Sequence, residues 1–311
     1  MKVLVTRRIH QSAVDLLSNT GFDVKYYNVN EPLDKNILAS VLPVFDAVLS
    51  CVSDKIDSNL INNAHPRLKA ISNMAVGLDN IDVKTAKSLG ISVFNTPNVV
   101  TESTADMTVA MAFALIRHIN AAHTFINEGK WTGWDPEIFI GKSFSKLTWG
   151  IVGLGNIGKA VAQRLSGFGM QVYFYDPNET GYSHTGAIKT NLELLLSLSD
   201  IVSLHLPLTS ETLHFINAEK ITQMKPSAVL INMARGGIVH SEALIKALHT
   251  KTIAGAALDV FDPEPIPSHH EILGFNNVIL TPHIGTATME CRRDMASMAA
   301  QNLIDFFQNK Y

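Results

Sequence analysis

The feature that most constrains this chain is a glycine-rich turn near its middle. The run Gly153-Leu154-Gly155-Asn156-Ile157-Gly158 follows an apolar, strand-like stretch at 148–152 and precedes a helical pattern at 159–168. In such a strand–turn–helix unit, glycines permit the tight turn, let a pyrophosphate approach the backbone and let the helix pack closely on the strand. The N–H groups at the helix start attract the phosphates. The pattern predicts a dinucleotide site whose contacting residues are Gly153, Gly155, Asn156, Ile157 and Gly158.

An acidic residue follows where the ribose of a dinucleotide is expected. Asp176 ends the next strand-like run, and no Arg or Lys occurs in the ten residues after it. A carboxylate there accepts hydrogen bonds from the ribose hydroxyls, whereas it repels the extra phosphate of NADP. We therefore expect NAD, with NADP less favoured. The alternative is that the glycines form only a tight turn and that Asp176 begins a β-turn before Pro177.

Strand-like and helical patterns alternate along the 311 residues, a length that suits about two hydrophobic cores. Apolar, β-rich runs occur at 2–6, 23–27, 47–50, 68–72 and 91–95, and again at 147–155, 171–177, 200–207, 228–234, 253–261 and 277–284. Strands that alternate with helices form parallel sheets. We expect the α/β class with two doubly wound parallel-sheet domains, one from residues 1–100 plus 288–311 and one from 101–287. Between the two sets of strands, residues 101–128 are expected to form one long, largely buried helix.

The charge balance and the cysteines exclude several classes of protein. Lys and Arg total 25 against 28 Asp and Glu, a net charge of −3, which gives no long-range attraction to nucleic acid or to an acidic membrane. Cys51 and Cys291 lack the spacing of a metal site or a disulfide framework. No apolar stretch suits a membrane span or a signal peptide. We expect a cytoplasmic protein without a metal, whose partner is a small molecule rather than nucleic acid or a membrane.

Polar residues follow three strand-like runs in the second half of the chain, and they are Arg235, then Asp259 with Glu264, then His283. The carboxyl ends of parallel strands meet at one edge of a sheet, where ligands bind in open α/β folds. Arginine can fork onto a carboxylate and polarise the neighbouring carbonyl, and histidine can exchange a proton near neutral pH. A carboxylate such as Glu264 on the other ring nitrogen holds the tautomer and favours the charged ring. The set predicts hydride transfer to and from a small 2-oxo or 2-hydroxy acid, with Arg235 as anchor and His283 as acid/base.

Each of these residues also has an ordinary structural interpretation. Alone, Arg235 fits a surface or helix-capping cation, Glu264 a solvated loop residue, and His283 a hydrogen-bonded residue at a strand end. Asp259 fits a turn as well as it fits a functional position. Their joint occurrence behind a dinucleotide pattern is what favours the catalytic interpretation.

The chain resembles the D-isomer-specific 2-hydroxyacid dehydrogenases over nearly its whole length. Seven ordered segments carry the resemblance: NMAVGLDNID (73–82), NTPNVVTESTADM (95–107), GIVGLGNIG (150–158), SLHLPLTSET (203–212), INMARGGIV (231–239), ALDVFDPEP (257–265) and LTPHIGTAT (280–288). The resemblance implies a flavodoxin-like substrate-binding domain from 1–100 plus 288–311, a Rossmann NAD-binding domain at 101–287, and a homodimer. The 129–144 segment is similar to that of glyoxylate and hydroxypyruvate reductases, in which a tryptophan reaches the neighbouring subunit's substrate pocket. Trp134 is the candidate here, and ordinary dimer packing is the alternative.

The resemblance also implies roles by matched position. Arg235 would bind the substrate carboxylate and carbonyl, His283 would be the acid/base, and Glu264 would be its partner. The backbone of Val76 and Gly77 would receive the substrate carboxylate. The cofactor site would be lined by Thr104, His205, Pro207, Thr212, Met233 and Asp259. The chain departs from the family pattern in having Asn156 where a basic residue is usual, and many relatives in the reductase group use NADP although Asp176 favours NAD.

The leading hypothesis is NAD(H)-dependent reduction of glyoxylate or hydroxypyruvate to the 2-hydroxy acid. One alternative is a dehydrogenase of another D-2-hydroxy acid, such as D-lactate, phosphoglycerate or a sugar acid. A different class is an NAD-sensing binding protein of the same fold, similar to the carboxyl-terminal binding corepressors, which would be expected to show a peptide groove or a disordered tail. A formate dehydrogenase is less favoured, because no counterpart of the longer N-terminal region of that group is seen.

Overall fold

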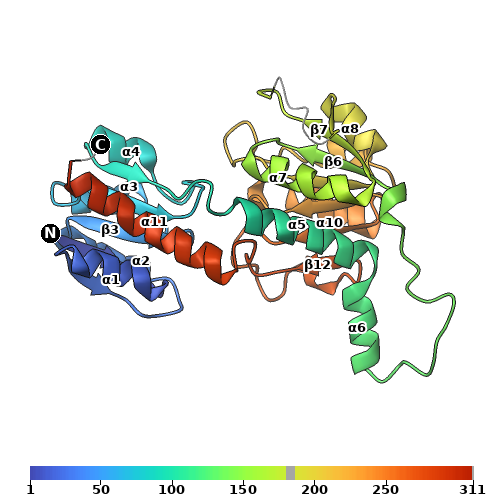
Figure 1. Ribbon diagram of the computed structural model, residues 1–311, viewed down its shortest axis with the longest axis horizontal. Coiled ribbons are helices and arrows are strands. Elements are labelled where there is room, and N and C mark those ends of the chain that lie inside the picture. Colours follow the sequence, from blue (N-terminus) through green and yellow to red (C-terminus); the bar gives the residue numbers. More distant parts are fainter. Residues whose placement is uncertain (180–185, 310–311) are drawn as a thin grey trace. The chain divides into compact units, whose positions relative to one another are not determined.

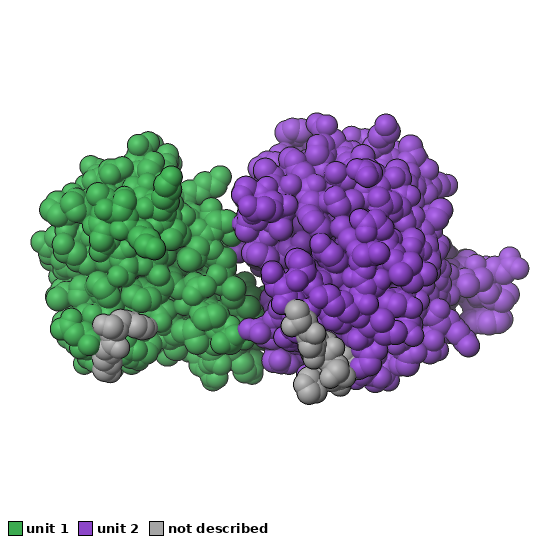
Figure 2. Space-filling model, turned by 90° about the horizontal axis from the view of Figure 1, so that it is seen from above, with its two compact units in different colours: residues 1–100, 286–311 green, residues 101–285 purple. Residues whose placement is uncertain are grey.

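The computed structural model describes residues 1–179 and 186–309. The chain divides into two compact units, residues 1–100 with 286–311 and residues 101–285, which are coloured separately in Figure 2. It passes from one unit to the other after Val100 and returns after Gly285. The return lies two residues before the position expected from the sequence.

The first unit contains a five-stranded parallel sheet with strand order β2-β1-β3-β4-β5. This is the flavodoxin-like order, in which the chain winds first to one side of β1 and then to the other. Helix α11, from the far end of the chain, lies beside α1 and packs on β4 (Figure 1). The elements are β1 Lys2–Val5, α1 Gln11–Asn19, β2 Asp23–Tyr26, α2 Lys35–Val41, η1 Leu42–Val44, β3 Ala47–Cys51, α3 Ser58–Ala64, β4 Ala70–Met74, α4 Val83–Ser88, β5 Ser92–Phe94 and α11 Met289–Phe307.

The second unit contains a seven-stranded parallel sheet with order β12-β11-β10-β9-β6-β7-β8. The winding direction reverses between β6 and β9, and in such sheets ligands bind beyond the strand ends at the reversal. The elements are α5 Thr101–Ile116, α6 Ile119–Asn127, η2 Phe144–Lys146, β6 Thr148–Val152, α7 Asn156–Leu165, η3 Ser166–Phe168, β7 Gln171–Tyr175, β8 Ile188–Lys189, α8 Leu192–Leu198, β9 Ile201–Leu204, α9 Ala218–Thr222, β10 Val229–Asn232, η4 Gly236–Ile238, α10 Ser241–His249, β11 Gly255–Leu258, η5 Glu271–Gly274 and β12 Val278–Leu280.

The central strands form because they are apolar on both faces. Every residue of β4, β9, β10 and β11 is buried, as expected for parallel strands that helices cover on both sides. The largest fully buried side chain is Trp149 of β6, whose Nε1 donates to Ser203 Oγ of β9 at 2.8 Å. That bond satisfies the one polar atom of the indole. The predicted fold class, two doubly wound parallel sheets, is confirmed.

The single helix predicted at 101–128 is wrong. The segment forms two helices, α5 and α6, that are bent by 61°. His118 lies between them in the left-handed conformation, with φ of 55°. α5 contributes eight residues to the interior, whereas no residue of α6 is buried. Tertiary packing stabilises most helices in proteins, so nothing holds α6 in line with α5 once it leaves the core.

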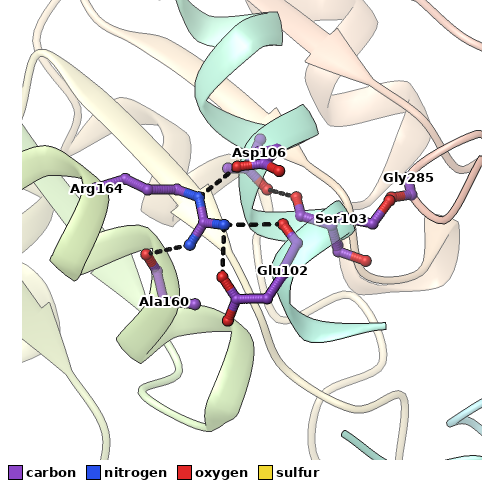
Figure 3. A network of polar contacts seen from close by, with 8 residues as sticks. Glu102, Ser103, Asp106, Ala160, Arg164 and Gly285 are labelled. Atoms are coloured by element: carbon purple, nitrogen blue, oxygen red, sulfur yellow. Dashed lines mark hydrogen bonds and ion pairs between the residues drawn. The ribbon is translucent and has the colours of Figure 1, made fainter. Parts of the chain in front are cut away.

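One arginine fastens the first turns of α5 to α7. Arg164 donates from Nη2 to Glu102 Oε2 at 2.7 Å and from Nε to Asp106 Oδ1 at 2.6 Å (Figure 3). Beside them, Ser103 Oγ donates to the carbonyl oxygen of Gly285 at 2.8 Å. The two places where the chain enters and leaves the second unit are thereby joined.

Among the described residues, no single helix has both the length and the apolar composition needed to cross a membrane, and α5 and α6 meet the requirement only as a bent pair. In the same part of the chain, no three His, Cys, Asp or Glu side chains are grouped so that they could hold a metal ion. Cys51 and Cys291 are both free thiols.

Candidate active site

The glycine-rich turn lies at the carboxyl end of β6, where the strand order reverses. Gly153 has φ of +92°, and a β-carbon there would stand 2.7 Å from the His205 carbonyl oxygen. A β-carbon on Gly158 would press on the carbonyl oxygen of Gly153. Around Gly155, which precedes α7, no neighbouring atom of the described chain lies within 4 Å of where a β-carbon would be. The fold therefore requires the first and third glycines, whereas the second leaves open space at a helix start that can bind an anion.

Asp176 lies directly after β7 and is bonded to this turn. Its Oδ2 accepts from the Leu154 N–H at 2.8 Å, and its Oδ1 accepts from the Asn178 N–H at 2.8 Å. Asn156 and Ile157 are the first two residues of α7. Since each carboxylate oxygen has two lone pairs, the fixed carboxylate can still accept from hydroxyl groups of a ligand.

The loop after β9 carries three of the predicted cofactor residues. His205 Nε2 lies 3.0 Å from Ser203 Oγ, and burial lowers the pKa of His205 to about 4, so that the ring is neutral at physiological pH. Thr212 Oγ1 donates to the Pro207 carbonyl at 2.6 Å and accepts from the Thr209 N–H at 2.8 Å. These bonds close the loop and hold the predicted residues on one short segment.

Thr104, Met233 and Asp259 come together around Gly285. A β-carbon on Gly285 would stand 3.2 Å from Asp259 Oδ2, 3.2 Å from Met233 Cε and 3.7 Å from Thr104 Cγ2. The three side chains come from α5 and from the ends of β10 and β11. Residues far apart in the sequence thus line one place at the edge of the second unit's sheet.

The buried carboxylate of Asp259 organises the loop after β12. It accepts from Thr281 Oγ1 at 2.6 Å, from the Ile284 N–H at 2.8 Å and from the Gly285 N–H at 2.7 Å. Inside that loop, His283 has φ of 54°, and its N–H donates to the Asp259 carbonyl at 2.9 Å. A left-handed backbone costs a non-glycine residue about 1–3 kcal/mol and persists only where the surroundings hold it, often at functional sites.

Glu264 and His283 form a hydrogen-bonded pair. His283 Nδ1 lies 2.6 Å from Glu264 Oε1, and the Phe261 N–H donates to Glu264 Oε2 at 3.2 Å. Burial alone raises the pKa of Glu264, but the hydrogen bond and charge of His283, the Phe261 N–H and the charge of Arg235 together lower it below its ordinary value. The carboxylate is therefore charged at neutral pH and holds a proton on Nδ1. His283 Nε2 has no hydrogen-bond partner within residues 1–179 and 186–309, which leaves this nitrogen for proton exchange.

Arg235 lies between β10 and η4, next to this pair. A β-carbon on Gly236 would fall on the Phe261 carbonyl, so the Arg235 loop is pressed against the loop that leads to Glu264. The Arg235 charge also contributes to the lowered pKa of Glu264. The structure thus brings Arg235, Glu264 and His283 to one edge of the sheet.

Three predicted residues are not part of that group. Val76 and Gly77 belong to the first unit and lie in the loop after β4. Neither N–H donates a hydrogen bond to any described residue. Trp134 lies between α6 and η2 with 86% of its surface exposed.

Known proteins share both the sequence and the fold of this chain. Residues 109–285 match the family model for the D-isomer specific 2-hydroxyacid dehydrogenase, NAD binding domain. The chain belongs to this family. The dehydrogenase is 42% identical to a glyoxylate reductase of Thermococcus litoralis, over 98% of this chain and 93% of that one. It is similar in structure to the TT0316 protein from Thermus thermophilus, with a TM-score of 0.93 and 38% identity over 99% of this chain and 97% of that one. A D-lactate dehydrogenase from Aquifex aeolicus, complexed with NAD and lactic acid, has a TM-score of 0.85 and 30% identity over 99% and 96% of the two chains.

The family makes this dehydrogenase an NAD-dependent oxidoreductase of small 2-oxo and 2-hydroxy acids, which confirms the predicted cofactor and class of reaction. The residues of the glycine turn fit NAD. Open space at Gly155 and the start of the ten-residue α7 suit the pyrophosphate, and the Asp176 carboxylate suits the ribose. Lys159 of α7 forms an ion pair with Glu179 at 2.5 Å. This pairing balances the lysine charge, which would otherwise favour the 2′-phosphate of NADP.

Two residues of the site, Gly236 and Gly285, are not among those predicted from the sequence, although each lets two loops of the dehydrogenase approach closely. Both glycines occur within segments that carry predicted site residues, Arg235 in one case and His283 in the other. A glycine beside a polar strand-end residue indicates close backbone approach, and this was the signal available.

Proposed function

We propose that this dehydrogenase reduces glyoxylate or hydroxypyruvate to the corresponding 2-hydroxy acid with NADH. The observation that carries the proposal is the 2.6 Å contact between Glu264 and His283 beside Arg235. The 42% identity to a glyoxylate reductase over 98% of the chain supports this substrate class. Reduction of a 2-oxo acid needs a proton for the carbonyl oxygen and a positive charge for the carboxylate. The Glu264–His283 pair supplies the proton, and Arg235 supplies the charge.

Each member of the group has one role. The Arg235 guanidinium forks onto the substrate carboxylate and polarises the neighbouring carbonyl. His283, protonated on both nitrogens, gives the Nε2 proton to the carbonyl oxygen as it becomes an alcohol, while Glu264 keeps hold of Nδ1–H. NADH, when bound, supplies the hydride that reduces the carbonyl carbon. In the oxidative direction, the neutral His283 accepts the alcohol proton at Nε2.

The remaining sites divide between the two units. The first unit binds substrate, and the N–H groups of Val76 and Gly77 receive the substrate carboxylate, because adjacent free N–H groups form an anion site. The second unit binds the cofactor. Its contacts are the glycine turn with Asn156 and Ile157, Asp176 at the ribose, and the lining residues Thr104, His205, Pro207, Thr212, Met233 and Asp259.

The active enzyme in this proposal is a cytoplasmic homodimer. No residue of α6 is buried, and Trp134, which follows it, is almost fully exposed. If a second copy of the chain covers this segment, Trp134 of one subunit reaches the substrate pocket of the other. The free thiols of Cys51 and Cys291 suit the reducing conditions of the cytoplasm.

The test is NADH oxidation by the purified protein with glyoxylate, hydroxypyruvate, pyruvate and 2-ketogluconate, repeated with His283→Gln. We expect turnover on the first two acids and a fall in kcat of about 10²–10⁴-fold in the variant, since proton transfer is what is lost. The NADH dissociation constant of the variant serves as the control and should stay within about twofold of the parent value. Turnover on pyruvate alone would move the substrate to D-lactate, and unchanged kcat in the variant would refute the role of His283.

A further inference from the structure

The loop after β4 has three successive carbonyl groups that are held from within the first unit. The hydrogen bonds run from Thr96 N to Ala75 O at 2.9 Å, from Asn95 Nδ2 to Val76 O at 2.8 Å and from Asn73 Nδ2 to Gly77 O at 3.0 Å. In a trans peptide the C=O and N–H groups point in opposite directions. Holding the carbonyls of residues 75–77 therefore turns the N–H groups of residues 76–78 away from the donors. None of those three N–H groups donates to a residue that the structure describes.

Asn73 differs from Asn95, the other side-chain donor, because it is fully buried, whereas Asn95 is only partly buried. Besides the Gly77 carbonyl, its Nδ2 donates to Asn80 Oδ1 at 2.9 Å, and its Oδ1 accepts from Ser50 Oγ of β3 at 3.1 Å. Both amide hydrogens and the amide oxygen are thus occupied. A flipped or displaced amide would leave buried polar atoms unpaired, which costs about 1–3 kcal/mol for each atom, so the orientation of Asn73 is fixed.

Asn80 extends the same network to the preceding loop. Its Nδ2 donates to the carbonyl oxygens of Cys51 at 3.1 Å and Asp54 at 2.9 Å. The segment that carries the free N–H groups is therefore tied at both ends, through Asn73 and Asn80, to the carboxyl ends of β3 and β4.

We propose that Asn73 is a positioning residue for substrate binding. Its bond to the Gly77 carbonyl fixes the Gly77–Leu78 peptide and, together with the bonds that hold the Ala75 and Val76 carbonyls, keeps the N–H groups of residues 76–78 directed at the carboxylate of the 2-oxo acid. The inference rests on the proposed function, in which Val76 and Gly77 receive that carboxylate. Asn73 lies beneath the loop and acts through the backbone rather than by contact with substrate. Asn73 therefore affects the affinity for substrate, and it does not affect proton transfer or cofactor binding.

The test is Asn73→Asp, which keeps the size of the side chain and removes both amide donors. We expect KM for glyoxylate and the inhibition constant of oxalate, an unreactive analogue, to rise together by about tenfold, the effect of one weakened hydrogen bond to a charged group. The value of kcat and the NADH dissociation constant should stay within about twofold, since the Arg235–Glu264–His283 group is unchanged. Asn63→Asp is the matched control, because it makes the same replacement in the same unit, where Nδ2 donates to the Ala39 carbonyl at 3.0 Å. It should leave every constant at the parent value.

Ser50→Ala is the second variant, for the case that Asn73→Asp does not fold. It removes only the hydrogen bond to Asn73 Oδ1, and we expect a smaller rise in both constants, about two- to fourfold. Hydrogen exchange of the 74–80 backbone gives a readout without cofactor: oxalate should slow exchange in the parent protein and in Asn63→Asp, but much less in Asn73→Asp or Ser50→Ala. Unchanged KM, oxalate inhibition and exchange in a folded variant, with normal glyoxylate reduction by the parent, would overturn the inference and leave the proposed function standing. A parent protein that reduces no 2-oxo acid and shows no oxalate effect would overturn both.

Discussion

The carboxylate of Glu264 experiences opposing influences on its pKa. Burial raises the pKa, while His283, the Phe261 N–H and Arg235 lower it, and the net shift is downward from the ordinary value of 4.5. The folded state therefore favours the charged form. The resulting stabilisation is present at pH values above the ordinary pKa and is lost as the pH falls through the lowered folded pKa.

We predict that Glu264→Gln, which keeps the shape and removes the charge, lowers the melting temperature at neutral pH. The difference from the parent protein should shrink as the pH falls below 4.5, the ordinary pKa of the group. Because 37% of the Glu264 side chain is exposed, solvent screens the pair and the difference should be small. Thermal unfolding followed over the acid to neutral range measures it. A gap of constant size at every pH would contradict this interpretation of the pair.

Asp176 offers a second test at a single residue. We predict that Asp176→Ala raises the ratio of NADPH to NADH efficiency by about tenfold, because the carboxylate that repels a 2′-phosphate is gone. The same carboxylate also accepts from the Leu154 and Asn178 N–H groups, so the alanine variant alters the loop as well. Asp176→Asn retains an acceptor and loses the charge, which separates the two effects. Ratios unchanged in both variants would show that Asp176 does not discriminate between the cofactors.

At the scale of elements, we predict opposite effects on stability for alanine substitutions at two glycines of the β6–α7 turn, Gly158 and Gly155. Gly158→Ala places a methyl group on the Gly153 carbonyl, so the turn must shift and the melting temperature should fall markedly. Gly155→Ala meets no neighbouring atom of the described chain within 4 Å, and its φ of −70° suits alanine. It should keep the parent melting temperature and weaken NADH binding by about tenfold, because the methyl group enters the space left for a phosphate. Calorimetry measures the melting temperatures of the two variants, and titration measures their NADH binding. Normal NADH binding by Gly155→Ala would refute the placement of a cofactor phosphate at Gly155.

The strands were predictable because buried parallel strands are read as continuous apolar runs. β8 was not among them, since it has only two residues and both are exposed. The break between α5 and α6 was also missed. Apolar residues keep their helical spacing across Arg117 and His118, and the left-handed conformation of His118 depends on where the chain must go rather than on its residue type.

The residues at the second unit's sheet edge could be proposed from sequence because strand order places the ends of neighbouring strands together. Glu264 and His283 do lie within hydrogen-bond distance, although their roles remain a prediction. The hydrogen bonds that hold the backbone within each unit could not be foreseen. The carboxylate of Asp259 orders the His283 loop, and Asn73 holds the Gly77 carbonyl, through backbone atoms whose directions exist only in the folded chain.

At the scale of the whole molecule, one segment lacks a core of its own. Residues 117–141 belong to the second unit but extend away from its core, and they return to it where Gly141 packs against the backbone of Ile116. The segment is held together by Phe125 and Phe139, whose ring centroids are 5.4 Å apart. It exposes several large apolar side chains: Ile119, Ile126, Trp131, Trp134 and Ile140. Several exposed large apolar side chains on one segment are typical of an interface between chains.

We therefore predict that the protein is a dimer of twice the 34.0 kDa chain mass and that Ile126→Glu with Ile140→Glu converts it to a monomer. Charges placed in an apolar interface remain unpaired, whereas the same charges are solvated in the free chain. Leu194→Glu is the matched control, because it places a charge on an exposed leucine of α8, outside the segment. Light scattering after gel filtration measures the mass, and a double variant that stays dimeric would place the interface elsewhere.

The Trp134→Ala variant separates two functions of the segment, dimer packing and contact with substrate. If Trp134 reaches the neighbouring subunit's pocket, the variant stays dimeric and its KM for glyoxylate rises. If Trp134 only packs at the interface, the dimer weakens, while KM measured at a protein concentration high enough to keep the variant dimeric stays the same.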